Sequence, residues 1–176
     1  MSALLLARIQ FAFTIGFHFL FPAMTLGTAL VLLLSETLHR IKKDLRYRRI
    51  TDFLARLLGL IFVVGAATGL AMEFSFGTNW SNYARAVGDI FGPILAAEGV
   101  IAFFLESVFI GVLIFGRSRV SPRVYWLSAL LVFIGGHLSA FWIIAANSWM
   151  QTPAGGVFQG GVFHLENFWG AVFNPD

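Results

Sequence analysis

Long apolar stretches constrain this chain more than any other feature. Four of them reach or exceed the roughly 20 residues that a helix needs to cross a bilayer. They cover Ile9–Ser35, Phe53–Met72, Ile90–Phe115 and Tyr125–Ala146. Only 12% of the 176 residues are charged and 58% are hydrophobic, whereas about a quarter of a soluble domain is charged. We therefore expect an all-α fold, a polytopic transmembrane helix bundle with four spans.

The chain divides into two regions. Residues 1–150 contain the four spans, and residues 151–176 begin with the turn-forming run Thr152–Gly156 and contain no further span. This second region is predicted to be an outer, periplasmic loop, and we expect the chain to be truncated before the next span. The N-terminus lacks a basic segment ahead of its apolar residues, so it does not resemble a cleaved signal peptide.

Basic residues predict the orientation, because Lys and Arg concentrate in cytoplasmic loops. Ten of the twelve lie around the first and third loops, which are therefore predicted to be cytoplasmic, with the N-terminus outside. The net charge of +3 then reflects topology and does not indicate a nucleic-acid surface. The ten are Arg40, Lys42, Lys43, Arg46, Arg48, Arg49, Arg56, Arg117, Arg119 and Arg123.

Ionisable side chains inside the spans are few, and such residues are functional candidates because an unpaired charge in the membrane is costly. They are His18, Glu98, Glu106 and His137, with Glu73 near a span end. Cysteine is absent, which excludes disulfides, thiolate-bound clusters and c-type haem attachment. Two intramembrane histidines are too few for a copper–haem oxidase.

Three of these residues are placed by helix geometry. At 1.5 Å per residue from the outer end of each span, His18 lies roughly 14 Å deep and Glu98 roughly 12 Å deep. Glu106 lies about 12 Å deeper and some 80° further round the helix. His18 and Glu98 at one level could bind a metal or haem iron, and Glu106 could relay protons from the cytoplasm.

Simpler roles remain open for each candidate. His18 could hydrogen-bond a carbonyl, and the two acids could form structural hydrogen bonds between helices. His137 suits a structural or cavity-lining role. Arg8 could reach lipid headgroups or pair with a haem propionate. A haem-free proton or ion transporter with intramembrane carboxylates and a purely structural helical subunit are the alternative functions.

Several segments of the sequence resemble subunit I of the cytochrome bd-type quinol oxidases, including the cyanide-insensitive branch. FFLES and NSWMQ are the most specific of them. The segments are Arg8–Phe11, His18–Phe21, Ala67–Phe74, Phe76–Trp80, Gly88–Gly92, Glu98–Gly99, Phe103–Ser107 and Asn147–Gln151.

The resemblance implies an oxidase of the bacterial plasma (inner) membrane that oxidises quinol and reduces dioxygen to water, with proton uptake from the cytoplasm. It implies high-spin and low-spin haem b, and haem d or a second haem b in its place. His18 matches an axial ligand of a high-spin haem, Glu98 an acid at the same haem pair, and Glu106 an acid of the proton path. Residues 1–150 would then form a haem-binding region.

The resemblance also implies parts that this chain lacks. The family has about nine spans, and its low-spin haem ligands and quinol loop come from later ones. The expected partners are the remainder of subunit I, a second subunit, quinol, dioxygen and membrane lipid, and we expect the fragment alone to be inactive.

Overall fold

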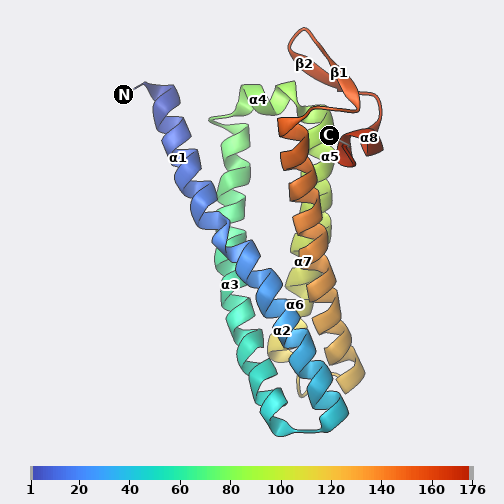
Figure 1. The fold of residues 1–176 in the computed structure, drawn as a ribbon. Helices are drawn as coiled ribbons and strands as arrows, with labels where there is room; N and C mark the ends of the chain where they lie inside the picture. Colours follow the sequence, from blue (N-terminus) through green and yellow to red (C-terminus); the bar gives the residue numbers. More distant parts are fainter. Residues whose placement is uncertain (1, 175–176) are drawn as a thin grey trace.

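The computed structural model describes residues 2–174, apart from the side chains of residues 101 and 102. Long helices run side by side, and a small cap of short elements covers one end (Figure 1). The elements in order are α1 Ala3–His18, α2 Leu20–Lys42, α3 Leu45–Gly77, α4 Ser81–Ala86, α5 Gly88–Glu98, the π-helix η1 Gly99–Phe104, α6 Leu105–Phe115, α7 Pro122–Gln151, β1 Gly156–Gln159, β2 Val162–Leu165 and α8 Phe168–Val172.

The predicted all-α membrane bundle is confirmed, and the chain is a multi-pass membrane protein. Three of the described helical stretches are long and apolar enough to cross a bilayer: Ala3–Lys42, Leu45–Gly77 and Pro122–Gln151. The predicted third span corresponds to α5, η1 and α6, which follow one another without a break. These helices extend past the predicted boundaries, except that α6 ends at the predicted Phe115. The 33 residues of α3 span about 50 Å, against about 30 Å of hydrocarbon.

The first predicted span is divided at Phe19, between α1 and α2. Pro22 lies four residues after His18 and has no backbone N–H, so the helical hydrogen bond to the His18 carbonyl cannot form. Proline is a known cause of sharp helix kinks. His18 therefore ends α1 at the break; α1 continues close to the line of α2, contacts α3, and has its outer end away from the rest of the bundle (Figure 1).

Only Lys43 and Asp44 join α2 to α3. Lys43 ends α2 in the left-handed conformation, with φ 54°, and the Asp44 side chain caps α3 by accepting a hydrogen bond from the Arg46 amide. His39, expected in a loop, lies in α2, because the helix extends seven residues past the predicted end of the span. This short turn makes α2 and α3 antiparallel neighbours.

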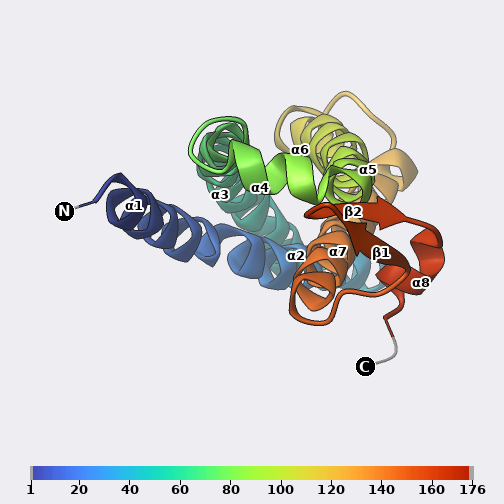
Figure 2. The ribbon, with the colours of Figure 1, turned by 90° about the horizontal axis from the view of Figure 1, so that it is seen from above.

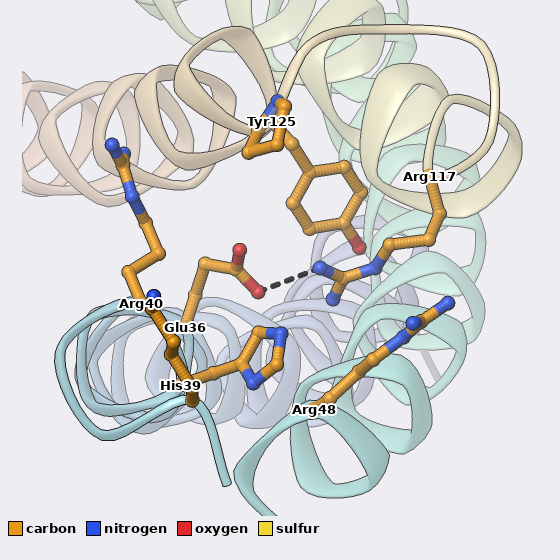
Figure 3. Close-up of a pocket in the computed structure, with 8 residues that line it drawn as sticks. Glu36, His39, Arg40, Arg48, Arg117 and Tyr125 are labelled. Carbon is orange, nitrogen blue, oxygen red and sulfur yellow. Dashed lines mark hydrogen bonds and ion pairs between the residues drawn. The ribbon is translucent and has the colours of Figure 1, made fainter. Parts of the chain in front are cut away.

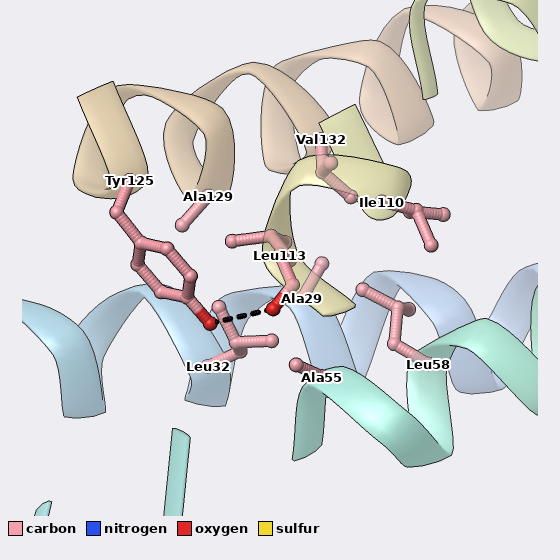
Figure 4. Close-up of a cluster of buried hydrophobic side chains, with 9 residues drawn as sticks. All are labelled: Ala29, Leu32, Ala55, Leu58, Ile110, Leu113, Tyr125, Ala129 and Val132. Carbon is pink, nitrogen blue, oxygen red and sulfur yellow. Dashed lines mark hydrogen bonds between the residues drawn. The ribbon is translucent and has the colours of Figure 1, made fainter. Parts of the chain in front are cut away.

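The best-packed part of the bundle lies between α2, α3, α6 and α7 (Figure 4). Alanines at 29, 55 and 129 let the helix backbones approach closely. The buried Tyr125 hydroxyl donates a hydrogen bond to the Leu113 carbonyl at 2.8 Å. This core holds α6, which carries Glu106, in position against α2, α3 and α7. Its buried members are Ala29, Leu32, Ala55, Leu58, Ile110, Leu113, Tyr125, Ala129 and Val132.

The predicted outer loop contains a β-hairpin and a short helix that the sequence reading did not anticipate. β1 and β2 pair antiparallel, and Gly160 and Gly161 turn between them with φ 58° and 80°. Seen from above, the hairpin lies over the ends of α5 and α7, with α4 beside it (Figure 2). Phe163 of β2 packs on Trp149 of α7, at 4.7 Å between ring centroids. Residues 175 and 176 of the predicted loop lie outside the described residues.

Candidate functional site

Glu106 is the most enclosed of the predicted intramembrane acids. It is the second residue of α6, is 7% exposed, and faces Gly135 and Gly136 of α7. A Cβ at Gly136 would lie 2.8 Å from Glu106 Oε1, so only glycine leaves room for the carboxylate in this position. Oε1 has no hydrogen-bond partner among the described residues. A buried carboxylate oxygen without a partner is costly and is therefore a strong candidate for holding a proton or a water molecule.

Glu98 ends α5 and is half-buried against the same helix. The Ser139 hydroxyl donates a long hydrogen bond of 3.4 Å to Glu98 Oε1. Ser139 lies four and three residues beyond Gly135 and Gly136, so the two acids meet α7 about one turn apart. Both predicted acids therefore face α7 from one side of the bundle.

The π-helix η1 accounts for this common direction. A regular α-helix would place Glu98 and Glu106 about 80° apart. All six residues between Gly99 and Phe104 are instead π-helical, and each of them turns the chain by less than an α-helical residue does. The accumulated difference brings Glu106 back toward the face that carries Glu98. π-helices are rare and concentrate at functional sites.

Glu73, which the sequence placed near a span end, lies close to the other acids. It lies within α3, and its carboxylate is near enough to interact electrostatically with that of Glu98, as Glu98 does with Glu106. Glu73 lies four residues after Gly69, which faces His18, and residues four apart share a helix face. This spacing could have indicated that Glu73 lies on the same face of α3 as Gly69. Glu73 is exposed in this chain, whereas Glu98 is half-buried and Glu106 is buried.

His18 has a defined orientation at the kink. Its Nδ1 lies 2.9 Å from Thr68 Oγ1 of α3, and the Thr68 hydroxyl has its own acceptors in the Val64 and Gly65 carbonyls. We therefore assign the proton to Nδ1, which donates to Thr68, leaving the Nε2 lone pair free. A Cβ at Gly69 would lie 3.1 Å from His18 Cε1, so a larger residue there would require the ring to shift by a few tenths of an ångström.

The structure does not bring His18 into contact with Glu98. Among the described residues they share no hydrogen bond or ion pair, and no group of three His, Asp or Glu side chains could hold a metal ion. A metal centre here would thus take one ligand from His18 and the rest from elsewhere. Haem fits this requirement, because the porphyrin supplies four nitrogens and the protein one or two axial ligands.

The remaining predicted residues are peripheral within this chain. Arg8 is exposed on α1 and has no ion pair among the described residues, so its two proposed roles stay predictions. His137 is exposed on α7, and its Nδ1 donates to the Phe133 carbonyl of its own helix at 2.8 Å. Its ring lies 4.2 Å from that of Phe133. These contacts match the structural role expected for His137.

An ion-pair cluster at the opposite end of the bundle was not predicted. The Arg117 guanidinium, between α6 and α7, donates to Glu36 at 2.8 Å and to Asp52 at 2.9 Å, and lies 3.7 Å from the Tyr125 ring centroid. Burial lowers the pKa of Arg117, but Tyr125 and the two carboxylates outweigh it, so the net shift is upward. The cluster ties α2 and α3 to the α6–α7 connection.

Together these features define a class: a multi-pass membrane protein with two intramembrane carboxylates facing one helix, and a histidine at a helix break whose ring is oriented by a neighbouring helix. Ionisable residues inside membrane spans commonly mark proton or ion pathways in other membrane proteins. The chain belongs to the cytochrome bd terminal oxidase subunit I family, whose model matches residues 6–176.

Similar proteins agree with this family. Cytochrome bd ubiquinol oxidase subunit 1 of Bacillus subtilis (strain 168) is 46% identical over 175 residues, 99% of this chain and 37% of that protein. Cytochrome bd-II ubiquinol oxidase subunit 1 of Escherichia coli (strain K12) is 47% identical over 172 residues, 97% of this chain and 34% of that protein. The structure of bd oxidase from Geobacillus thermodenitrificans has a TM-score of 0.90 at 26% identity, over 98% of this chain and 40% of that one. The chain thus spans little more than a third of its curated relatives' length.

Proposed function

We propose that this chain is the haem-bearing part of a terminal quinol oxidase, in which quinol is oxidised and dioxygen is reduced to water. The observation that carries the proposal is the His18 imidazole, held through Nδ1 by Thr68 with Nε2 free, in a chain of this family. The relatives at 46% and 47% identity are named ubiquinol oxidase subunits, so a haem-free transporter is not favoured.

The residues present are compatible with haem. His18 would be an axial ligand through Nε2, Glu98 would lie in the environment of the haem pair, and Arg8 would pair with a propionate. Haem iron supplies the one-electron and dioxygen chemistry when it is bound. The set we propose for the whole protein is high-spin and low-spin haem b with haem d or a second haem b.

The interior acids would supply protons to that centre. We place the first and third loops in the cytoplasm of a bacterial inner membrane, from the distribution of Lys and Arg. A proton entering from that side would reach Glu106 first and then Glu98. Glu106 Oε1 has no partner among the described residues and can accept the proton without breaking an existing bond. Ser139 orients Glu98 as the next group.

The remainder of the complex would complete the site. No residue of Ala3–His18, all of which the structure describes, is buried in this chain. Large apolar side chains such as Phe13, which is 77% exposed, would therefore be covered by lipid, haem or further helices. We propose that the rest of subunit I and a second subunit supply the low-spin haem ligands, the quinol site and part of this cover.

The test is optical spectroscopy of the full-length subunit, expressed with its partner subunit. His18→Ala should abolish one high-spin haem signal. His137→Ala is the matched control, because this second intramembrane histidine is bonded to its own helix and should leave the haem spectrum unchanged. An unaltered spectrum in His18→Ala would remove His18 as a ligand.

A further inference from the structure

A cationic pocket lies where α2 ends and α3 and α7 begin (Figure 3). It has a volume of about 400 Å³, within the range of small-molecule sites. The helices that form it meet at the end of the bundle that carries both basic loops. Its lining residues are Glu36, His39, Arg40, Lys43, Arg48, Arg117, Pro122 and Tyr125.

The charges in this pocket are not balanced within the chain. Glu36 pairs with Arg117, and Asp52 pairs with Arg117 and, at 3.8 Å, with Arg48. Arg40 and Lys43 have no carboxylate within ion-pair distance among the described residues. The pocket therefore carries surplus positive charge in a partly enclosed place, where an anion would be held more strongly than on an open surface.

A second cavity of about 440 Å³ adjoins the first through Arg40, which lines both. Its other lining residues are Thr37, Ile41 and Trp126. The Trp126 indole N–H donates to Thr37 Oγ1 at 2.8 Å, and the Arg40 guanidinium lies 5.6 Å from the Trp126 ring centroid. Ile41 is 72% exposed. Trp126 is half-buried, and a tryptophan with its N–H bonded and its ring partly exposed is typical of the membrane interface.

We propose that this pair of cavities binds one anionic phospholipid, with its phosphodiester headgroup in the cationic pocket and its glycerol and upper acyl chain on Ile41 and Trp126. A soluble phosphate would use the cationic pocket alone, so the adjoining cavity, to which Ile41 and Trp126 contribute apolar surface, is the feature that favours a lipid. Basic pockets between membrane helices on the cytoplasmic side bind anionic headgroups elsewhere. The proposal does not depend on the haem assignment.

Native mass spectrometry of the full-length complex, titrated with phosphatidylglycerol, tests the proposal. The variant is Arg40→Gln with Lys43→Asn, since asparagine tolerates the left-handed backbone of Lys43. The control is Arg49→Gln with Arg56→Gln, which removes equal charge from α3 at residues that line neither cavity. We expect about thirty-fold weaker retention of one lipid in the variant, from about 1 kcal/mol for each lost charge, and unchanged retention in the control.

Three outcomes would overturn the proposal. The first is equal loss in the variant and the control, which would indicate a diffuse charge effect. The second is wild-type complex that retains no phosphatidylglycerol in preference to phosphatidylcholine, as expected if other parts of the complex fill the pocket. The third is displacement of the lipid by glycerol 1-phosphate at matched concentration, because the occupant would then be a soluble phosphate and the apolar cavity would contribute nothing.

Discussion

Replacing Arg117 by glutamine should destabilise the bundle more than any other loss of a single surface-loop charge. The Glu36 side chain is 2% exposed, and Arg117 is its ion-pair partner. Removing one member of a buried pair leaves an uncompensated charge, at a cost of about 3–5 kcal/mol. Asp52 is 37% exposed and keeps Arg48 nearby, so it should contribute little to this cost. The Tyr125 ring also loses its cation–π contact.

The assay is the free energy of unfolding of the full-length subunit in detergent, by denaturant titration. Adding Glu36→Gln to Arg117→Gln should recover most of the loss, because the charge that lacks a partner is removed with it. Arg119→Gln, two residues along in the same connection and exposed, should change stability by less than about 0.5 kcal/mol. If the loss of unfolding free energy in the double variant equals the sum of the losses in the two single variants, the unpaired Glu36 charge is not the cause of the destabilisation and the argument is wrong.

Three further substitutions test other contacts. Gly69→Ala should displace the His18 ring and shift the absorption of the haem it would ligate, without removing the signal, because the new Cβ would lie 3.1 Å from Cε1; an identical spectrum would contradict this contact. Gly136→Ala should push the Glu106 carboxylate aside at a cost of about 1–3 kcal/mol, and should slow proton uptake in stopped-flow measurements; uptake at the wild-type rate would separate Glu106 from the path. The Arg46 guanidinium holds the pKa of Asp44 below its usual value of about 3.9, so the stabilising charge is present above that pH and is lost as the pH falls below it. Asp44→Asn should therefore flatten the acid side of the melting temperature profile, and a profile that falls as steeply as in wild type would refute the assignment.

The helices and the interior acids could be predicted because both depend on local composition. Long apolar runs can satisfy their backbone hydrogen bonds in lipid only as helices. A glutamate in such a run must turn inward, which is what Glu106 does. The break at Phe19 could also have been predicted, since Pro22 removes the bond to the carbonyl four residues earlier. The Gly160–Gly161 pair also could have predicted the β-hairpin, because two-residue hairpin turns favour Gly-Gly.

The alignment of the acids and the ion-pair cluster could not be read in the same way. Whether Gly99–Phe104 forms an α-helix or a π-helix depends on packing against α7, because no residue type in that segment demands the wider turn. Arg117 is 81 positions from Glu36 and 65 from Asp52. Any of ten basic residues at that end could have paired with these acids, so only the folded arrangement selects one.

The break at Phe19 separates two parts of the first span, α1 and α2, that are stabilised by different means. After the break, α2 packs into the core that contains the three alanines. In contrast, α1 has no buried residue in this chain and packs against α3 and whatever surrounds it in the assembled protein. We therefore expect α2 and its core contacts to form during synthesis, before any prosthetic group binds. The segment that bears His18 would be the last to become protected from hydrogen exchange, and the first to lose that protection when iron porphyrin is withdrawn.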